Sequence, residues 1–504
     1  MDALDPVIGG FQTALSLHNL LFCAVGVILG TVIGLLPGLG SATGVALLMP
    51  LTLGLEPVTA LIMLAGLYYG TQYGGTISSV LVSSPGEAST VVSTFDGYQM
   101  ARQGRAGQAL AIAAIASFVA GTLTIVLLMA LAPVFAGIAV DFGPPEMVGL
   151  VVVGLVGVVG LSRGIQMLKG LAMGALGVAV ATIGFDPQTA VQRFTFGSVE
   201  VLGGIQFVPV VIGLFAIAEV MSQARATPAD PIRARFRDLL LTRDDLHRSR
   251  APIGRGTVLG FFLGTLPGAG ATIASFVTYD VEKRVSKRKH EFGKGAIEGV
   301  AGPEAANNAA VNGAFVPTLT LGIPGSGTTA VLLGAFLLFG IQPGPLLMDK
   351  EPDLVWGLMA SFYVGNVLLL ILNLPMAPIF ASMLRVRYAV LYPVILSASL
   401  LGAYALENRM WGAWVAVGAA LVGYFLKRYD FPPAPVILGL ILGPMLEQSL
   451  NQTSSMGSGD FGIFLHRPIA LALLALSVAI LLVPTIVARL RGPRSGAERQ
   501  LIDD

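Results

Sequence analysis

The sequence "GLLPGLGSATG" (residues 34–44) interrupts an apolar run at a point where a membrane helix would be expected to continue. The same pattern returns as "GTLPGAGATIA" at residues 264–274. Proline removes a backbone donor and glycine permits left-handed backbone, so a Pro-Gly pair in such a run predicts a broken helix. Two apolar segments broken in the same way predict an internal repeat.

The composition indicates a membrane protein. Of the 504 residues, 54% are hydrophobic and only 12% are charged, about half the charged fraction of an average soluble chain. Apolar runs at 110–140, 147–161 and 469–487 are long enough to cross a bilayer. We therefore expect an all-α polytopic membrane protein. The start of the chain lacks basic residues, so we expect no cleavable signal peptide.

Charge and cysteine content argue against several other classes. The net charge is +1, which gives no reason to expect a nucleic-acid partner. Cys23 is the single cysteine and lies in an apolar run, so it predicts a packing residue and no internal disulfide. The chain contains no Walker loop and no Cys/His metal spacing. We expect no cofactor and no metal other than a transported Na⁺.

Basic clusters predict the orientation. The stretches 225–255 and 282–294 are rich in lysine and arginine, which places them in the cytoplasm. Polar segments without a basic excess are placed outside. The path that satisfies these assignments has about 11–12 spans, a periplasmic N-terminus and a cytoplasmic C-terminus. Its full crossings are predicted at 58–73, 107–136, 146–163, 167–184, 203–221, 296–311, 353–381, 389–407, 411–426, 433–450 and 467–488.

Four further segments must enter and leave the membrane on the same side for this path to hold. Each contains a Pro-Gly pair, and each half is too short for a comfortable span. We therefore expect re-entrant hairpins or broken helices. The segments are 18–54, 76–100, 257–281 and 313–341, with Pro-Gly at 37–38, 85–86, 267–268 and 324–325.

The four breaks form two matching pairs. Residues 30–40 and 260–270 are identical at six of eleven positions, and "GGTISSVLVSSPGEAST" (74–90) matches "GAFVPTLTLGIPGSGTT" (313–329) in the same order. The charged flanks swap sides between the halves, which predicts an inverted-topology repeat, an architecture of many secondary transporters. The expected parts are a first repeat at 1–222 with hairpins near 37 and 85, a basic cytoplasmic linker at 223–256, a second repeat at 257–488 with hairpins near 267 and 324, and a cytoplasmic tail at 489–504.

The breaks also predict an anion site. A helix that restarts after a break presents unpaired N–H groups and a partial positive charge. Four such ends near the midplane, with hydroxyl residues beside them, could bind a carboxylate. The alternative is that the breaks only kink tightly packed helices, but their occurrence in two repeat pairs favours the site. The candidate substrate-binding residues beside the breaks are Gly38, Gly40, Ser41, Thr43, Ser84, Gly86, Gly268, Gly270, Thr272, Gly325, Ser326 and Thr328.

Residues 299–315, "GVAGPEAANNAAVNGAF", form a polar island. Its polar residues share one face of a helix, and a carboxylate with amide oxygens there suits Na⁺ coordination or proton uptake. Hydrogen bonding between helices is an equally open interpretation. The candidate cation-coupling residues are Glu304, Asn307, Asn312 and, after the second Pro-Gly, Glu87; Asn308 is a candidate substrate ligand.

An enzyme is not expected. Asp280 in "TYD" and Asp460 in "GSGD" resemble the paired aspartates of intramembrane proteases, but both lie beside loops and the Pro-Ala-Leu element is missing. The four histidines lie at predicted helix ends or in loops. A channel, or an uncoupled permease, is the rival function, and the lack of a charged filter ring counts against a channel.

Three stretches resemble a known family: residues 30–52, residues 68–89, and the run from Gly264 to Phe336. They are similar to the large permease subunit, TctA, of tripartite tricarboxylate transporters. The resemblance implies an inner-membrane symporter that works with a small membrane subunit and a periplasmic substrate-binding protein. It implies uptake of di- or tricarboxylates such as citrate, driven by Na⁺ or H⁺, with the Pro-Gly motifs and the Asn-rich helix as the transport site.

The predicted mechanism is alternating access of the substrate site to the two sides of the membrane, with lipid around the protein. A carboxylate would be held between hairpin tips of both repeats, with a cation nearby on Glu304 or the asparagines. The hairpins would then move against the remaining helices, most simply in an elevator-like motion, although rocking is an alternative. The sequence leaves a homodimer open.

Overall fold

The computed structural model describes residues 5–36, 38–160, 165–186, 189, 191–223, 232, 239–268, 270–384 and 388–490. Helices dominate this part of the chain. Its one sheet is an antiparallel pair, β1 (Gly184–Phe185) and β2 (Gln192–Arg193). The predicted all-α fold is confirmed.

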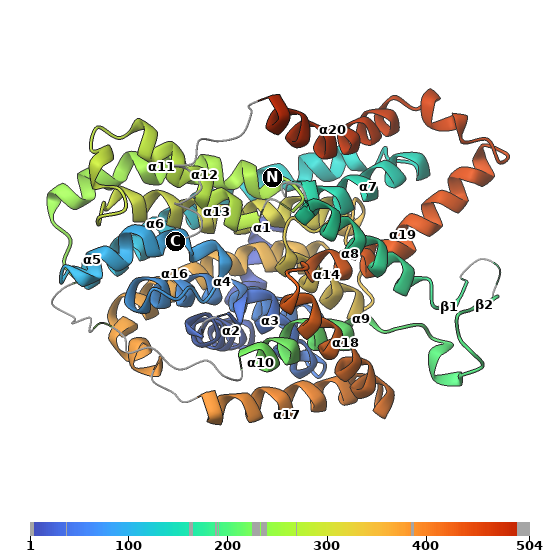
Figure 1. The fold of residues 1–504 in the computed structure, drawn as a ribbon, viewed down its shortest axis with the longest axis horizontal. Helices are drawn as coiled ribbons and strands as arrows, with labels where there is room; N and C mark the ends of the chain where they lie inside the picture. Colours follow the sequence, from blue (N-terminus) through green and yellow to red (C-terminus); the bar gives the residue numbers. More distant parts are fainter. Residues whose placement is uncertain are drawn as a thin grey trace.

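The helices form two groups, shown in Figure 1 with α3 and α14 near the middle of the view. The core group contains α1 (Asp5–Leu15), α2 (Leu17–Leu35), α4 (Pro57–Val82), η2 (Ala88–Thr90), the π-helix η3 (Thr94–Tyr98), α5 (Gln99–Arg102), α6 (Ala106–Ala139), α11 (Arg243–Thr265), α12 (Gly270–Val285), η7 (Lys289–Glu291), α13 (Glu298–Leu321), α15 (Leu347–Lys350) and α16 (Pro352–Met383).

The outer group lies along two sides of the core group, with α20 and α7 at the top of Figure 1 and α17 at the bottom. It contains α7 (Pro144–Gly160), α8 (Ile165–Ala181), η4 (Val199–Val201), α9 (Phe207–Val211), the π-helix η5 (Ile212–Ile217), α10 (Ala218–Gln223), α17 (Tyr388–Glu407), α18 (Met410–Arg428), α19 (Ala434–Met456), η8 (Phe461–His466) and α20 (Pro468–Leu490). The elements between the groups are α3 (Gly40–Leu48), η1 (Met49–Thr52) and α14 (Gly327–Leu338).

Hydropathy identifies the helices that could cross a membrane. Within the described residues, four helices are long and apolar enough to cross a membrane, at Leu17–Leu35, Ala106–Ala139, Pro352–Leu372 and Met410–Arg428. In contrast, α13 carries two carboxylates and three asparagines, yet its residues from Glu298 to Thr320 are all buried. A polar helix is tolerated at membrane depth when protein surrounds it.

Glycines set the close approach of two central helix pairs, α2 with α4 and α11 with α13. A Cβ atom on Gly30 would lie 2.8 Å from the Leu67 Cα, and one on Gly260 would lie 2.6 Å from the Ala306 Cα. Gly34 and Gly264, one turn further on, face the partner backbone in the same way. These shared glycines therefore pack helices, as small residues do in membrane bundles, and lie before the breaks.

Several predicted boundaries are wrong. The helix α4 runs unbroken through residue 73, and α13 runs unbroken through residue 311. Each of these two predicted crossings therefore continues, as one helix, into the first half of the hairpin predicted after it. Glycines in these helices do not interrupt them, because Gly74 and Gly313 allow contact with the Thr31 and Phe261 carbonyl oxygens. The predicted linker at 223–256 stays a prediction, because residues 224–231 and 233–238 lie outside the described residues; its last part forms the start of α11 at Arg243.

Candidate functional site

The first and third breaks have the same backbone conformation. Gly38 and Gly268 have φ values of +80° and +78°, and Gly40 and Gly270 have +60° and +56°. These are left-handed values that glycine adopts without a steric penalty. Pro37 and Ala269 lie outside the described residues.

Each of these breaks is hydrogen-bonded to the next break of its own half. The Gly40 amide donates to the Gly86 carbonyl oxygen at 3.2 Å, and the Gly268 amide donates to the Gly325 carbonyl oxygen at 3.1 Å. A backbone N–H group that one break leaves without a partner in its own helix therefore bonds a carbonyl oxygen of the other break. Buried backbone polar groups need such partners. Four Pro-Gly segments far apart in the chain thus form two interlocked pairs.

The two pairs meet through the first and fourth breaks. The hydroxyls of Ser41, at the start of α3, and Thr328, at the start of α14, are 2.7 Å apart and buried. The Tyr68 hydroxyl of α4 lies 3.4 Å from the Ser326 hydroxyl. On the other side, α12 after the third break packs against η2 after the second. The predicted convergence of the breaks therefore matches the structure.

A carboxylate already occupies the start of α3. The Ser41 amide donates to Glu87 Oε2 at 2.5 Å, a charge-assisted bond to a helix N-terminus. Ser326, which follows the Pro-Gly of the fourth break as Glu87 follows that of the second, instead caps α14. Its hydroxyl accepts from the Thr329 amide at 3.2 Å, and its amide donates to the Thr329 hydroxyl at 2.8 Å.

The expectation of four helix N-termini is wrong in one respect. The second break leads into the 3₁₀ turn η2, and the helix that follows begins only at Val92 and passes through the π-helix η3 into α5. The breaks followed directly by α-helices lead into α3, α12 and α14. Of the other candidates, the Thr43 hydroxyl donates to the Phe215 carbonyl oxygen of η5 at 3.4 Å. Ser84 and Thr272 are half-buried at the second and third breaks.

Two asparagines of α13, Asn308 and Asn312, contact the neighbouring helix α6. Asn312 donates to the Gly121 carbonyl oxygen at 3.1 Å and to the Thr124 hydroxyl at 2.7 Å, and it accepts from the Tyr69 hydroxyl. Asn308 donates to the Ser117 hydroxyl at 2.6 Å. The contacts of Asn312 match the interhelical interpretation. The side-chain atoms of Asn307 and the Asn308 Oδ1 are buried without a hydrogen-bond partner.

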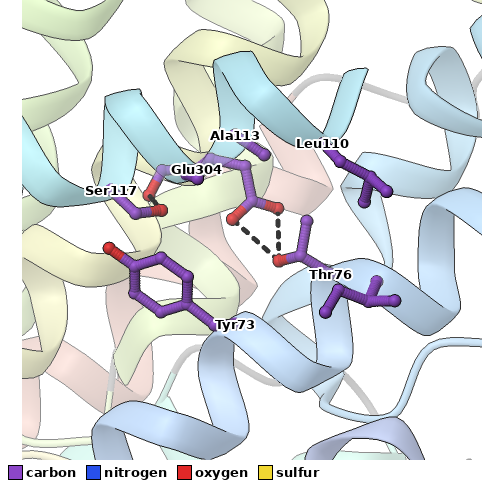
Figure 2. A pocket seen from close by; sticks show the side chains of 8 residues that line it. Tyr73, Thr76, Leu110, Ala113, Ser117 and Glu304 are labelled. Atoms are coloured by element: carbon purple, nitrogen blue, oxygen red, sulfur yellow. Dashed lines mark hydrogen bonds between the residues drawn. The ribbon is translucent and has the colours of Figure 1, made fainter. Parts of the chain in front are cut away.

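Glu304 lies one turn before Asn307 and is 2% exposed. Both carboxylate oxygens accept from the Thr76 hydroxyl at 2.9 Å, and Oε1 also accepts from Ser93. Figure 2 shows this carboxylate beside a cavity between α4, α6 and α13. The cavity, of about 10 Å³, is lined by Tyr73, Thr76, Ile77, Leu110, Ala113, Ala114, Ser117 and Glu304.

The tip of the first break also touches the outer group. A Cβ atom on Gly38 would lie 2.7 Å from the Glu219 Oε1 of α10 and would overlap the Gln223 side chain. Glu219 forms an ion pair with Lys427 of α18. The third break contacts a different helix of the outer group, α7. A Cβ atom on Gly157 of α7 would lie 2.7 Å from the Pro267 carbonyl oxygen.

The basic side of the core group is held by ion pairs outside the apolar segments. Arg248 contacts Glu291 at 2.5 Å and Glu298 at 2.7 Å, and the hydrogen bond with Glu298, followed by that with Glu291, raises the pKa of Arg248. Asp96 is fully buried and accepts from the amides of Gly293, Gly295 and Ala296, each at 2.8 Å. Asp96 therefore fixes the loop that leads into α13 by accepting hydrogen bonds from its backbone amides.

Comparison with known families decides the class of the protein. A family model described as the tripartite tricarboxylate transporter TctA family matches residues 20–438. The chain belongs to this family. It is a membrane subunit of a tripartite tricarboxylate transporter, which is a family of transport proteins. The predicted family is thereby confirmed.

Two curated relatives of this TctA protein come from Agrobacterium vitis. An uncharacterized 52.8 kDa protein in the TAR-I ttuC' 3' region is 43% identical over 505 residues, covering 100% of both chains. An uncharacterized protein in the TAR-II ttuC' 3' region is 44% identical over 245 residues, covering 49% of this chain and 100% of the relative. No solved structure matches the chain significantly.

Sequence reasoning missed two sets of hydroxyl residues: those that face the breaks and those that face the polar helix α13. Tyr68, Tyr73, Thr76 and Ser117 lie in long apolar helices, where such residues usually bond their own helix backbone. The Glu219–Lys427 pair was also missed. Its members are separated by about two fifths of the chain, and no local signal in the sequence connects them.

Proposed function

We propose that this TctA protein is the large subunit of a binding-protein-dependent secondary transporter that imports a di- or tricarboxylate. It works in the inner membrane with a small membrane subunit and a periplasmic binding protein. Uptake is symport coupled to Na⁺ or H⁺ and proceeds by elevator-like alternating access of an inverted repeat. The N-terminus lies outside and the C-terminus in the cytoplasm.

The observation that supports a carboxylate substrate is the Glu87 contact at the start of α3. A carboxylate oxygen lies 2.5 Å from the Ser41 amide, so this backbone end has the geometry to bind the functional group of the substrate. The Ser41 and Thr328 hydroxyls provide donors from both halves of the chain at one point. A substrate carboxylate that binds here displaces Glu87 or shares its donors.

The arrangement of the two groups supports the elevator-like motion. The groups touch mainly through α3, η1 and α14, which contact η5, α9, α17 and α19. The helices that carry the breaks are thus the ones that slide or separate when the groups move. This is the place where a transport site has to open to one side or the other.

Uptake into proteoliposomes tests the proposal. The vesicles contain this chain with its small subunit and binding protein, a panel of radiolabelled carboxylates is added, and Na⁺ and proton gradients are imposed separately. We expect gradient-driven uptake of at least one carboxylate. Ser41→Ala removes a buried hydrogen-bonding group, which is worth about 1 kcal/mol, and should lower uptake roughly five-fold.

Ser361→Ala is the matched control, because the buried Ser361 hydroxyl bonds only the Leu358 carbonyl oxygen of its own helix α16. Asn308→Ala tests the second candidate position. Uptake that ignores both gradients would favour a passive pore. No uptake of any carboxylate, or equal effects of Ser41→Ala and Ser361→Ala, would refute the proposed substrate site.

A further inference from the structure

The carboxylate of Glu304 has no positively charged partner among the described residues. The carboxylate accepts from Thr76 and Ser93, and the Asn307 and Ser117 side chains lie beside it. Glu304 takes part in none of the ion pairs formed by the described residues. At 2% exposure it is also shielded from water. An ionised carboxylate that is buried without a positive charge is strongly unfavourable, so such a group either takes up a proton or binds a cation. Glu304 is therefore a candidate cation ligand.

The groups around Glu304 supply oxygen atoms. The Thr76 hydroxyl lies 2.9 Å from both carboxylate oxygens, and the Ser117 and Tyr73 side chains line the same cavity from α6 and α4. Hydroxyl oxygens that donate to a carboxylate keep lone pairs available for a metal ion. Hard cations select oxygen ligands of this kind.

The cavity fits one small occupant. Its volume of about 10 Å³ is close to the space that one water molecule needs. As Figure 2 shows, the Glu304 carboxylate and the Thr76 hydroxyl point toward each other, the Tyr73 hydroxyl points toward Ser117, and Leu110 and Ala113 line the cavity from α6. A space of this size admits a water molecule or a desolvated alkali ion.

Unpaired amide atoms on α13 give an independent indication. The Asn308 Oδ1 and both polar side-chain atoms of Asn307 are buried without a partner, while the Asn308 Nδ2 holds Ser117 at 2.6 Å. Buried side-chain polar atoms are rarely left unpaired. Amide oxygens beside a carboxylate are ligands that a bound cation would satisfy.

We infer that Glu304, with Thr76, Ser93 and Ser117, binds one Na⁺ ion in this cavity. Its role in coupling rests on the proposed function, but the binding itself does not. The site belongs to one half only, because the alignment that matches Gly74 with Gly313 places Ala65 opposite Glu304. The chain therefore binds a single Na⁺ at this position.

Binding of ²²Na⁺ to the purified full-length protein, measured without carboxylate and without partner subunits, tests the inference. We expect saturable binding of one ion per chain, weakened at least ten-fold by Glu304→Gln and clearly reduced by Ser117→Ala. The matched controls are Glu56→Gln, at an exposed position, and Ser361→Ala, in a buried helix interior. Both should bind Na⁺ like the wild type.

The variants are first compared by size-exclusion chromatography. If Glu304→Gln does not fold, Glu304→Asp and Thr76→Val replace it, and each should weaken binding by a smaller factor. Unchanged ²²Na⁺ binding in the folded variants would overturn the inference, as would wild-type protein that binds no Na⁺ but takes up protons. Carboxylate uptake is measured separately, so a wrong substrate class would leave the Na⁺ result intact.

Discussion

Replacing Gly264 by alanine should destabilise the protein through a backbone collision. The new Cβ atom would lie 2.6 Å from the Ala310 Cα and 2.8 Å from the Ala310 carbonyl carbon, whereas carbon atoms attract best at about 3.5–4.0 Å. The obstacle is the backbone of α13, so no rotamer change relieves it. The helices α11 and α13 must separate locally by roughly 1 Å, and such overpacking costs about 1–3 kcal/mol.

Gly254 in the same helix is the matched control. A Cβ atom there meets nothing within 4 Å, so Gly254→Ala should gain about 0.5–1 kcal/mol from helix propensity. Thermal unfolding of the detergent-purified variants measures both changes. A shift of about 2–4 °C per kcal/mol should lower the midpoint for Gly264→Ala and slightly raise it for Gly254→Ala. Equal midpoints for the two variants would refute the packing role assigned to the glycines.

Two further predictions concern the ion pairs and the orientation. Arg255→Gln leaves Glu282, which is 1% exposed, without its two hydrogen bonds of 2.7 and 2.6 Å, and should cost about 1–3 kcal/mol of unfolding free energy. Arg284→Gln removes an exposed pair with Asp280 and should cost less than about 0.5 kcal/mol; similar losses for both would contradict this reasoning. Single cysteines at Glu56 and Gln342, both exposed, should react with a membrane-impermeant maleimide from the periplasmic side, with little background because Cys23 is 1% exposed. Labelling of either cysteine from the cytoplasmic side would contradict the inverted topology.

The sequence predicted the breaks well because their cause is local. A Pro-Gly pair restricts the backbone wherever it stands, and the left-handed glycines at 38, 40, 268 and 270 follow from it. The interlocking of the breaks was expected only in outline. The hydrogen bond from Gly40 to Gly86 joins two segments that both look like isolated kinks in a single sequence.

Helix boundaries were predicted less well because packing decided them. Gly74 and Gly75 look like a helix end, yet α4 continues through them, since Gly74 lies against the Thr31 carbonyl oxygen. The polar face of α13 was predicted correctly as a face, but its partners were not. Whether an asparagine binds an ion or a neighbouring helix depends on α6, whose Gly121 and Thr124 pair with Asn312 and give no sign of this in the sequence.

The contact between Ser41 and Thr328 has a consequence for movement of the helix groups when no substrate is bound. These two residues begin α3 and α14, and the same two helices supply most of the surface on which the groups of helices touch. In the proposed mechanism, the substrate site and the surface that slides are therefore built from the same two helices. An anion that draws α3 and α14 together changes the shape of the surface that has to slide. Such an arrangement makes the rate of movement depend on whether substrate is bound, without a separate site that senses the substrate.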